Sequence, residues 1–234
     1  MNILALDTTG PVAGAAVLKD GLPVYEGMAV NRLTHSVNLM PMVEEGLLRS
    51  GLAIDEIDLF AVAVGPGSFT GVRIGISTVK GLAHGAKKPC VGVDALEALA
   101  TGIPYFEGVI CPIQDARAGQ VYGAAFRAGL PPKRLMEDEA SKLPAYLEKV
   151  ASLGGPCLFV GDGVPVHQGA IAKALGNAAV FAPAHCRFLR PLSVALLAEA
   201  YKDQAVDYLT LMPMYLRAPQ AERLRKGRED PHGA

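Results

Sequence analysis

Short apolar runs separated by turn residues cover the first hundred positions of the chain. They predict strands at 3–6, 12–18, 23–30, 57–64 and 90–93. Asp20-Gly21 is a typical hairpin turn between the second and third of these strands. The fourth run shows little alternation between apolar and polar positions, which indicates a strand covered on both faces. The order begins with an antiparallel meander and continues with alternating helices and strands.

Apolar positions three and four residues apart predict the intervening helices. These run from Thr34 or Ser36 to about Arg49, from Val72 to Ala86, and from Asp94 to Thr101. Val37, Met40, Val43 and Leu47 share one face of the first helix. Pro41 lies inside it and predicts a kink or a late start.

A second round of elements begins after the break at 102–104. Strands are predicted at 109–114, 120–126 and 157–160, helices at 142–153, 166–175 and 192–202, and a loop at Pro131-Pro132. Three antiparallel strands followed by alternating helix and strand is the ribonuclease-H-like pattern. We therefore expect an α/β protein with a first lobe at 1–103, a second at 104–217 and a polar tail at 218–234.

Composition narrows the function classes. The chain has 234 residues, half of them hydrophobic, and a formal net charge of −1. A protein that binds RNA alone usually has a basic excess, so work on RNA would need a partner. Four separated cysteines and five unclustered histidines predict no metal site. No apolar run approaches the ~20 residues that cross a bilayer, and the N-terminal residues do not have the pattern of a signal peptide. We therefore expect a cytoplasmic protein without membrane contact.

The loop GPGSFTG at 65–71 follows a predicted buried strand and precedes a helix, the usual place of a phosphate-binding loop. A Walker A loop would need Lys and then Ser or Thr after Gly71, where Val72 and Arg73 stand. A dinucleotide-binding loop would need glycine at Thr70. Ser68 or Thr70 can still cap the helix and leave N–H groups for an anion. A purely structural turn remains equally open.

Two further features have two interpretations each. Asp7, before Thr8-Thr9, could hold a metal–phosphate or cap its own turn. Gly71, Gly75 and Thr78 repeat along one helix, where each glycine costs ~1 kcal/mol relative to alanine. Such glycines indicate close approach of the protein's own sheet or of another subunit, and the spacing does not choose between them.

The chain resembles the TsaB family, formerly called YeaZ, over nearly its whole length. The matching segments are ILALDTT at 3–9, HSVNLMPMVEEGL at 35–47, GPGSFTGVRIGISTVKGLA at 65–83, VGVDALEALA at 91–100, DARAGQVYGA at 115–124, VGDG at 160–163 and PMYLR at 213–217. Gln120 departs from the family pattern, which usually has Glu there. This puts a role for that carboxylate in doubt.

The resemblance implies an actin-like ATPase (acetate kinase/heat-shock-70/actin) fold of two ribonuclease-H-like lobes. It also implies a catalytic paralogue, TsaD, which transfers threonylcarbamoyl from threonylcarbamoyl-AMP to the adenosine 3′ of the anticodon, in tRNAs reading codons that start with A. An ATPase, TsaE, is a further implied partner. In the family, the helices after the HS pair and after GPGSFTG form the surface of a homodimer or of a heterodimer with TsaD. The implied interface residues are Val37, Met40, Val43, Leu47, Gly71, Arg73, Gly75, Thr78 and Leu82.

The same resemblance implies a subunit without catalytic residues or metal. Ala95 and Leu99 stand where TsaD-like proteins have an HxxxH metal pair. Asp115-Ala116-Arg117 replaces a phosphate loop, and its carboxylate would repel polyphosphate. The vestigial nucleotide loop comprises Asp7, Thr8, Thr9, Ser68 and Thr70. Weak nucleotide binding, including ADP at the complex interface, stays open, as do direct tRNA contact and the contacts of His35, Arg73 and Arg117.

Three other functions compete with this interpretation. An actin-like-fold kinase or ATPase would use Asp7 as its metal carboxylate, but the second phosphate loop is missing. A metalloprotease would need metal ligands that the chain lacks. A stand-alone homodimeric interaction module would have no part in tRNA modification.

Overall fold

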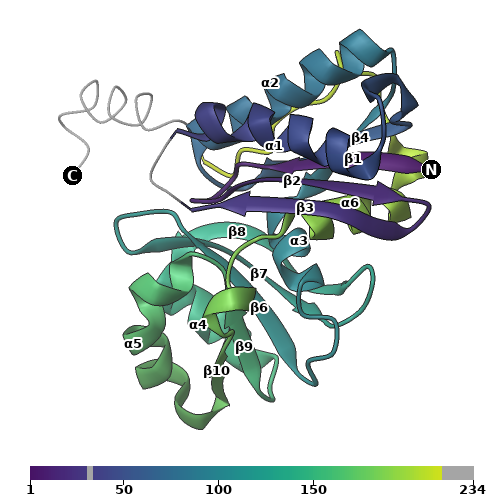
Figure 1. Cartoon of the computed structure of the whole chain (residues 1–234). Helices are drawn as coiled ribbons and strands as arrows, with labels where there is room; N and C mark the ends of the chain where they lie inside the picture. Colours follow the sequence, from purple (N-terminus) through teal and green to yellow (C-terminus); the bar gives the residue numbers. More distant parts are fainter. Residues whose placement is uncertain (31–33, 218–234) are drawn as a thin grey trace, which may run out of the picture.

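The computed structural model describes residues 1–30 and 34–217, so the predicted tail at 218–234 lies outside the described residues. Two five-stranded sheets lie one above the other in Figure 1. The first contains β1 (Asn2–Asp7), β2 (Ala13–Lys19), β3 (Leu22–Ala29), β4 (Leu59–Gly65) and β5 (Cys90–Asp94). The second contains β6 (Val109–Asp115), β7 (Gln120–Arg127), β8 (Lys133–Lys142), β9 (Cys157–Val160) and β10 (Ala179–Phe181). The six α-helices of the described residues are α1 (His35–Ser50), α2 (Phe69–Ala86), α3 (Ala95–Thr101), α4 (Leu143–Ser152), α5 (Gly163–Leu175) and α6 (Pro191–Ala200).

The two sheets repeat one topology. The first has the order β3-β2-β1-β4-β5, and the second has the equivalent order β8-β7-β6-β9-β10. In each sheet, the first strand pairs antiparallel with the second and parallel with the fourth. The predicted pair of ribonuclease-H-like lobes is confirmed.

The helices form separate layers around these sheets (Figure 1). α1 and α2 pack on the outer face of the first sheet, and α4 and α5 cover the second. α3 and α6 lie between the sheets, where a shared apolar core contains residues of both lobes, among them Ile3, Ala5, Ile110 and Phe126. Because burying one large apolar side chain contributes roughly 1.5–3 kcal/mol, this core links the lobes firmly.

The chain returns to the first lobe at its C-terminal end. α6 contacts β1 and β2 extensively, although the division at residues 103 and 104 assigns it to the second lobe. Beyond it, Val206 pairs with Cys90 at the start of β5, and the Met214 backbone N–H donates to the Val64 carbonyl over 2.8 Å. The first lobe is therefore completed by residues from both ends of the chain.

Several predicted elements differ from the structure. The pattern predicts a loop and then a helix after Pro131-Pro132, but β8 occupies Lys133–Lys142, and β10 is absent from the prediction. β8 is an edge strand without regular apolar alternation, which explains the error. α2 and α5 begin three residues earlier than predicted, and α1 begins at His35 despite Pro41, so the late start was wrong. No helix among the described residues is long and apolar enough to cross a membrane.

Candidate functional site

The GPGSFTG loop packs against the turn that follows β1. The Ser68 backbone N–H donates to the Thr9 carbonyl over 2.7 Å. A Cβ on Gly67 would lie 2.4 Å from that same oxygen, and one on Gly71 would lie 2.0 Å from the Thr8 carbonyl oxygen. Only glycine allows so close an approach of two backbones. The Ser68 hydroxyl also accepts a hydrogen bond from the Gly71 backbone N–H, so Ser68 caps α2.

Asp7 caps its own turn. Its Oδ1 accepts hydrogen bonds from the backbone N–H and the hydroxyl of Thr9, at 2.9 and 2.7 Å. The Thr8 hydroxyl donates to the Gly71 carbonyl over 2.7 Å, which ties this turn to α2. Asp7 is completely buried, and burial raises the pKa of its carboxyl to about 6 although the Thr9 donors oppose the shift. The second oxygen, Oδ2, has no hydrogen-bond partner.

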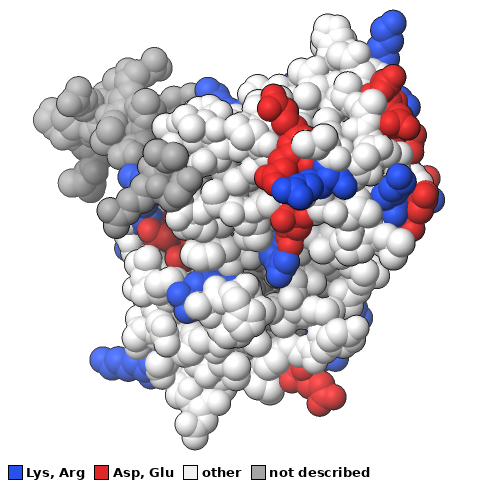
Figure 2. All heavy atoms as spheres, in the orientation of Figure 1, with Lys and Arg blue, Asp and Glu red and all other residues white. Residues whose placement is uncertain are grey.

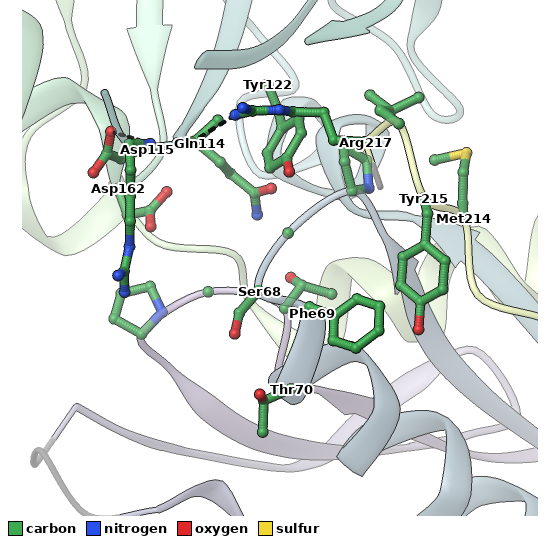
Figure 3. A pocket seen from close by; sticks show the side chains of 18 residues that line it. Ser68, Phe69, Thr70, Gln114, Asp115, Tyr122, Asp162, Met214, Tyr215 and Arg217 are labelled. Atoms are coloured by element: carbon green, nitrogen blue, oxygen red, sulfur yellow. Dashed lines mark hydrogen bonds between the residues drawn. The ribbon is translucent and has the colours of Figure 1, made fainter. Parts of the chain in front are cut away.

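A cleft of about 480 Å³ opens between the lobes beside these two loops (Figure 3). Its first-lobe wall includes Ser68, Phe69 and Thr70, and its second-lobe wall includes Gln114, Asp115, Arg117, Tyr122 and Asp162. Burial and the neighbouring carboxylates Asp115 and Asp7 raise the pKa of Asp162 to about 6. Asp115 and Asp162 place carboxylates in this wall of the cleft, and Arg117 and Arg217 add two guanidinium groups to the lining.

The chain segment at 214–217 closes one end of the cleft (Figure 3). The Tyr215 ring stacks on Phe69 with centroids 4.9 Å apart. Arg73 lies over the Phe69 ring and donates from Nε to the Tyr215 hydroxyl over 2.9 Å. Arg217 crosses to the second lobe, where its Nη1 donates to the Ala116 carbonyl over 3.0 Å. The Arg73 side chain is thus engaged within its own chain, which the sequence did not reveal.

The predicted interface residues on α1 and α2 differ in exposure. Val37 and Met40 are exposed on α1, together with Leu48, whose side chain is 80% exposed. Thr78 and Leu82 are half-buried on α2, and Arg73 is exposed there. Val43 is buried under α1, and Leu47 packs against the same core.

The predicted glycine-lined face needs a correction. Gly71 and Gly75 are buried against Thr8, which follows β1, and a Cβ on Gly75 would lie 2.6 Å from the Thr8 hydroxyl oxygen and 3.1 Å from a methyl group of Val62 in β4. These two glycines therefore serve packing on the protein's own sheet. The exposed small residues of α2 are Ser77, Gly81 and Gly85, and a Cβ on either glycine would meet nothing within 4 Å.

The remaining candidates lie at the start of α1, in the turn between β6 and β7, and in α3. His35 is half-buried at the start of α1, where burial lowers the pKa of its imidazole. Arg117 is exposed in a tight turn, and its backbone N–H donates to Asp115 Oδ1 over 3.0 Å. Ala95 and Leu99 are buried in α3. Within the described ranges 1–30 and 34–217, no group of three or more His, Cys, Asp or Glu side chains could hold a metal ion.

A family model described as "TsaD: tRNA N6-adenosine threonylcarbamoyltransferase" matches residues 30–224. The chain is 35% identical to the Bacillus subtilis tRNA threonylcarbamoyladenosine biosynthesis protein TsaB, over 95% of this chain and 96% of that protein. The chain belongs to the TsaB family. The Escherichia coli TsaB protein is 33% identical over 98% of this chain and all of that protein.

A solved structure is also similar to this chain. It is a Pseudomonas aeruginosa protein described as similar to the peptidase YeaZ, with a TM-score of 0.78 and 26% identity. The match covers 92% of this chain and 99% of that chain. With the two repeated sheets, these findings confirm the actin-like ATPase fold.

Proposed function

We propose that this protein acts in tRNA threonylcarbamoyladenosine biosynthesis as a non-catalytic partner subunit. It binds a TsaD paralogue and activates transfer of the threonylcarbamoyl group from threonylcarbamoyl-AMP to the adenosine 3′ of the anticodon. Membership of the TsaB family supports the pathway, and the match to a TsaD family model supports kinship with the enzyme. TsaE is a further partner in this proposal, and tRNA is reached only through the complex.

The observation that carries the partner role is an exposed and mostly apolar row on α1. Val37 is 57% exposed and Leu48 is 80% exposed, and with Pro41 and the charged Glu44 they follow one face of the helix at helical spacing. Beside it, α2 presents Ser77, Gly81 and Gly85, whose small side chains allow a second helix to approach closely. We call the exposed faces of α1 and α2 the helical face. A TsaD subunit occupies it in the complex, and a second copy of this chain occupies it when TsaD is absent.

The charge distribution favours an indirect route to tRNA. Figure 2 shows Lys and Arg side chains in small groups among uncharged surface, with no continuous basic area on this side of the molecule. Sequence-independent affinity for RNA comes mainly from phosphate contacts, which need such an area. We propose that no nucleotide cofactor is required in the cleft, since Val72 and Arg73 stand where a phosphate-binding loop has Lys and then Ser or Thr.

A paired substitution tests the partner role. Leu48→Glu and Gly81→Glu place a charge on the helical face without touching the core, and each should weaken binding to the TsaD of the same organism at least tenfold in a pull-down or calorimetric titration. Tyr105→Glu is the matched control, since Tyr105 is 93% exposed in the connection between α3 and β6. Full binding by both helical-face variants would refute this surface.

Activation is measured separately. Adding the protein to TsaD, TsaE, threonylcarbamoyl-AMP and tRNA should raise formation of the modified adenosine, and Leu48→Glu should remove that increase. Turnover of Mg–ATP by the isolated protein at sub-millimolar affinity would contradict the non-catalytic role and favour a kinase or ATPase.

A further inference from the structure

Residues of both lobes line a small void beside the cleft. Asp7 at the end of β1, Gln114 in β6 and Asp162 after β9 line this void, which has room for about 10 Å³. Asp7 Oδ2, Gln114 Oε1 and Asp162 Oδ1 are buried and have no hydrogen-bond partner. We call these three atoms and their void the acceptor site. A buried acceptor without a hydrogen bond destabilises the folded state, so three acceptors that line one void favour a ligand with several donors.

The acceptor site also carries uncompensated charge. In the part of the chain that the structure describes, no lysine or arginine forms an ion pair with Asp7 or Asp162. The pKa of each carboxyl is about 6, so both are mostly ionised above pH 7. A single water molecule fits the volume, but it supplies two donors for three acceptors and no charge. A small cation with N–H donors would supply both the hydrogen bonds and the charge.

We propose that the acceptor site binds the ammonium head of a small primary amine whose remaining atoms occupy the inter-lobe cleft. An ammonium group has three donors and one positive charge, which match three acceptor atoms and a net negative environment. The cleft adjoins the void, because Gly10, Gln114 and Asp162 line both. Figure 3 shows Gln114 and Asp162 near one end of the cleft and Tyr215 at the other.

The remainder of the cleft suits the body of such a ligand. Its volume of about 480 Å³ accommodates several non-hydrogen atoms beyond the ammonium group. Phe69, Tyr122 and Tyr215 supply apolar and hydroxyl contacts along its walls. Asp115 adds a carboxylate close to Asp162, and Arg117 and Arg217 also line the cleft. The proposal does not depend on partner binding at the helical face.

The first test uses methylammonium chloride as the probe, with tetramethylammonium chloride at equal ionic strength as the control. A ligand that binds only the folded state raises the unfolding temperature in proportion to its occupancy. Methylammonium should raise the unfolding temperature of the full chain at pH 7.5, and tetramethylammonium, which has no N–H donor, should not. Because both carboxyls must be ionised, the apparent affinity should fall about tenfold between pH 7.5 and pH 5.5.

Variants locate the effect. Asp162→Asn and, separately, Gln114→Met should each weaken methylammonium binding at least tenfold, and Glu148→Gln on the exposed surface of α4 should leave it unchanged. Using two variants keeps the test valid if one of them folds poorly. Equal effects of the two ammonium salts, or an unchanged response in both site variants, would overturn the proposal. Magnesium chloride acting at lower concentration with the same variant sensitivity would overturn it in favour of a metal site.

Discussion

The buried carboxyl of Asp7 makes the free energy of unfolding depend on pH. The pKa of its carboxyl is about 6 in the folded state and about 3.9 in an unfolded chain. The folded state therefore binds more protons between these values, and this group's contribution to stability falls as pH rises from about 4 to about 6. Above that range, the cost of the buried charge is fully present.

Asp7→Asn should remove this cost. We expect the free energy of unfolding at pH 7.5 to rise by about 1–3 kcal/mol and its decline between pH 4 and pH 6 to become shallower. Asn retains an oxygen for the two Thr9 donors, and its amide can donate toward Gln114 and Asp162. Urea denaturation from pH 4.5 to pH 8 measures both effects. An unchanged pH slope would show that Asp7 titrates near its ordinary value.

Two glycines of α2 differ in what surrounds them: one is in close contact with another backbone segment, and the other faces open space. Gly71→Ala should destabilise the protein by about 2–4 kcal/mol, since its Cβ would lie 2.0 Å from the Thr8 carbonyl oxygen and the backbones would have to separate. Gly81→Ala meets nothing within 4 Å and should stabilise it by about 0.5–1 kcal/mol. Chemical denaturation of both variants checks the contrast. Equal effects would refute the close contact at Thr8.

At the residue scale, the sequence predicted features that depend on neighbouring residues and missed those that depend on residues far apart in the chain. The glycine repeat correctly indicated close packing, but choosing between sheet and partner needed the position of Thr8, which lies 63 residues from Gly71. Ser68 was one of the two residues expected to cap α2, with Thr70, and the structure has Ser68 in that position. The acceptor site was missed, since Gln114 and Asp162 join Asp7 only through the packing of the two lobes.

At the scale of elements, buried strands were predicted from the sequence and a partly exposed edge strand was not. Strands β1 and β4 are buried on both faces, and their apolar runs identified them. β8 has the sequence KRLMEDEASK and lies at a sheet edge with most residues half-buried, so it lacks the alternation that marks a strand. α6 was found as a helix, but its return to the first sheet is a long-range contact that local periodicity does not encode.

The C-terminal segment at 205–217 contacts side chains of α2. Tyr215→Ala removes the stack on Phe69 and the acceptor of Arg73, so the segment should open more often. Amide hydrogen exchange at Met214, whose N–H bonds the Val64 carbonyl, should accelerate about tenfold, as expected when roughly 1.4 kcal/mol of local stability is lost. Tyr105→Ala, at a ring that is 93% exposed, is the control. Unchanged exchange at Met214 would mean that backbone pairing alone holds the segment.

At the scale of the whole molecule, the lobes depend on each other. The inner face of the first sheet is covered by α6, which comes from the far end of the chain. The core between the sheets contains residues of β1, α3, β6 and α6 together. A fragment with residues 1–103 would therefore expose Ile3 and Ala5, both fully buried in the intact protein, to water.

This dependence predicts that the first lobe does not fold alone. The fragment 1–103 should show no cooperative thermal transition by circular dichroism, whereas the chain 1–217 should unfold in one transition. Co-expression with a fragment of residues 104–217 should restore the transition, because it supplies α6 and the second sheet. A cooperative transition of the isolated fragment would instead make the two lobes independent folding units. The shared core would then only hold two independently folded domains together. The cleft between them could open and close without unfolding either domain.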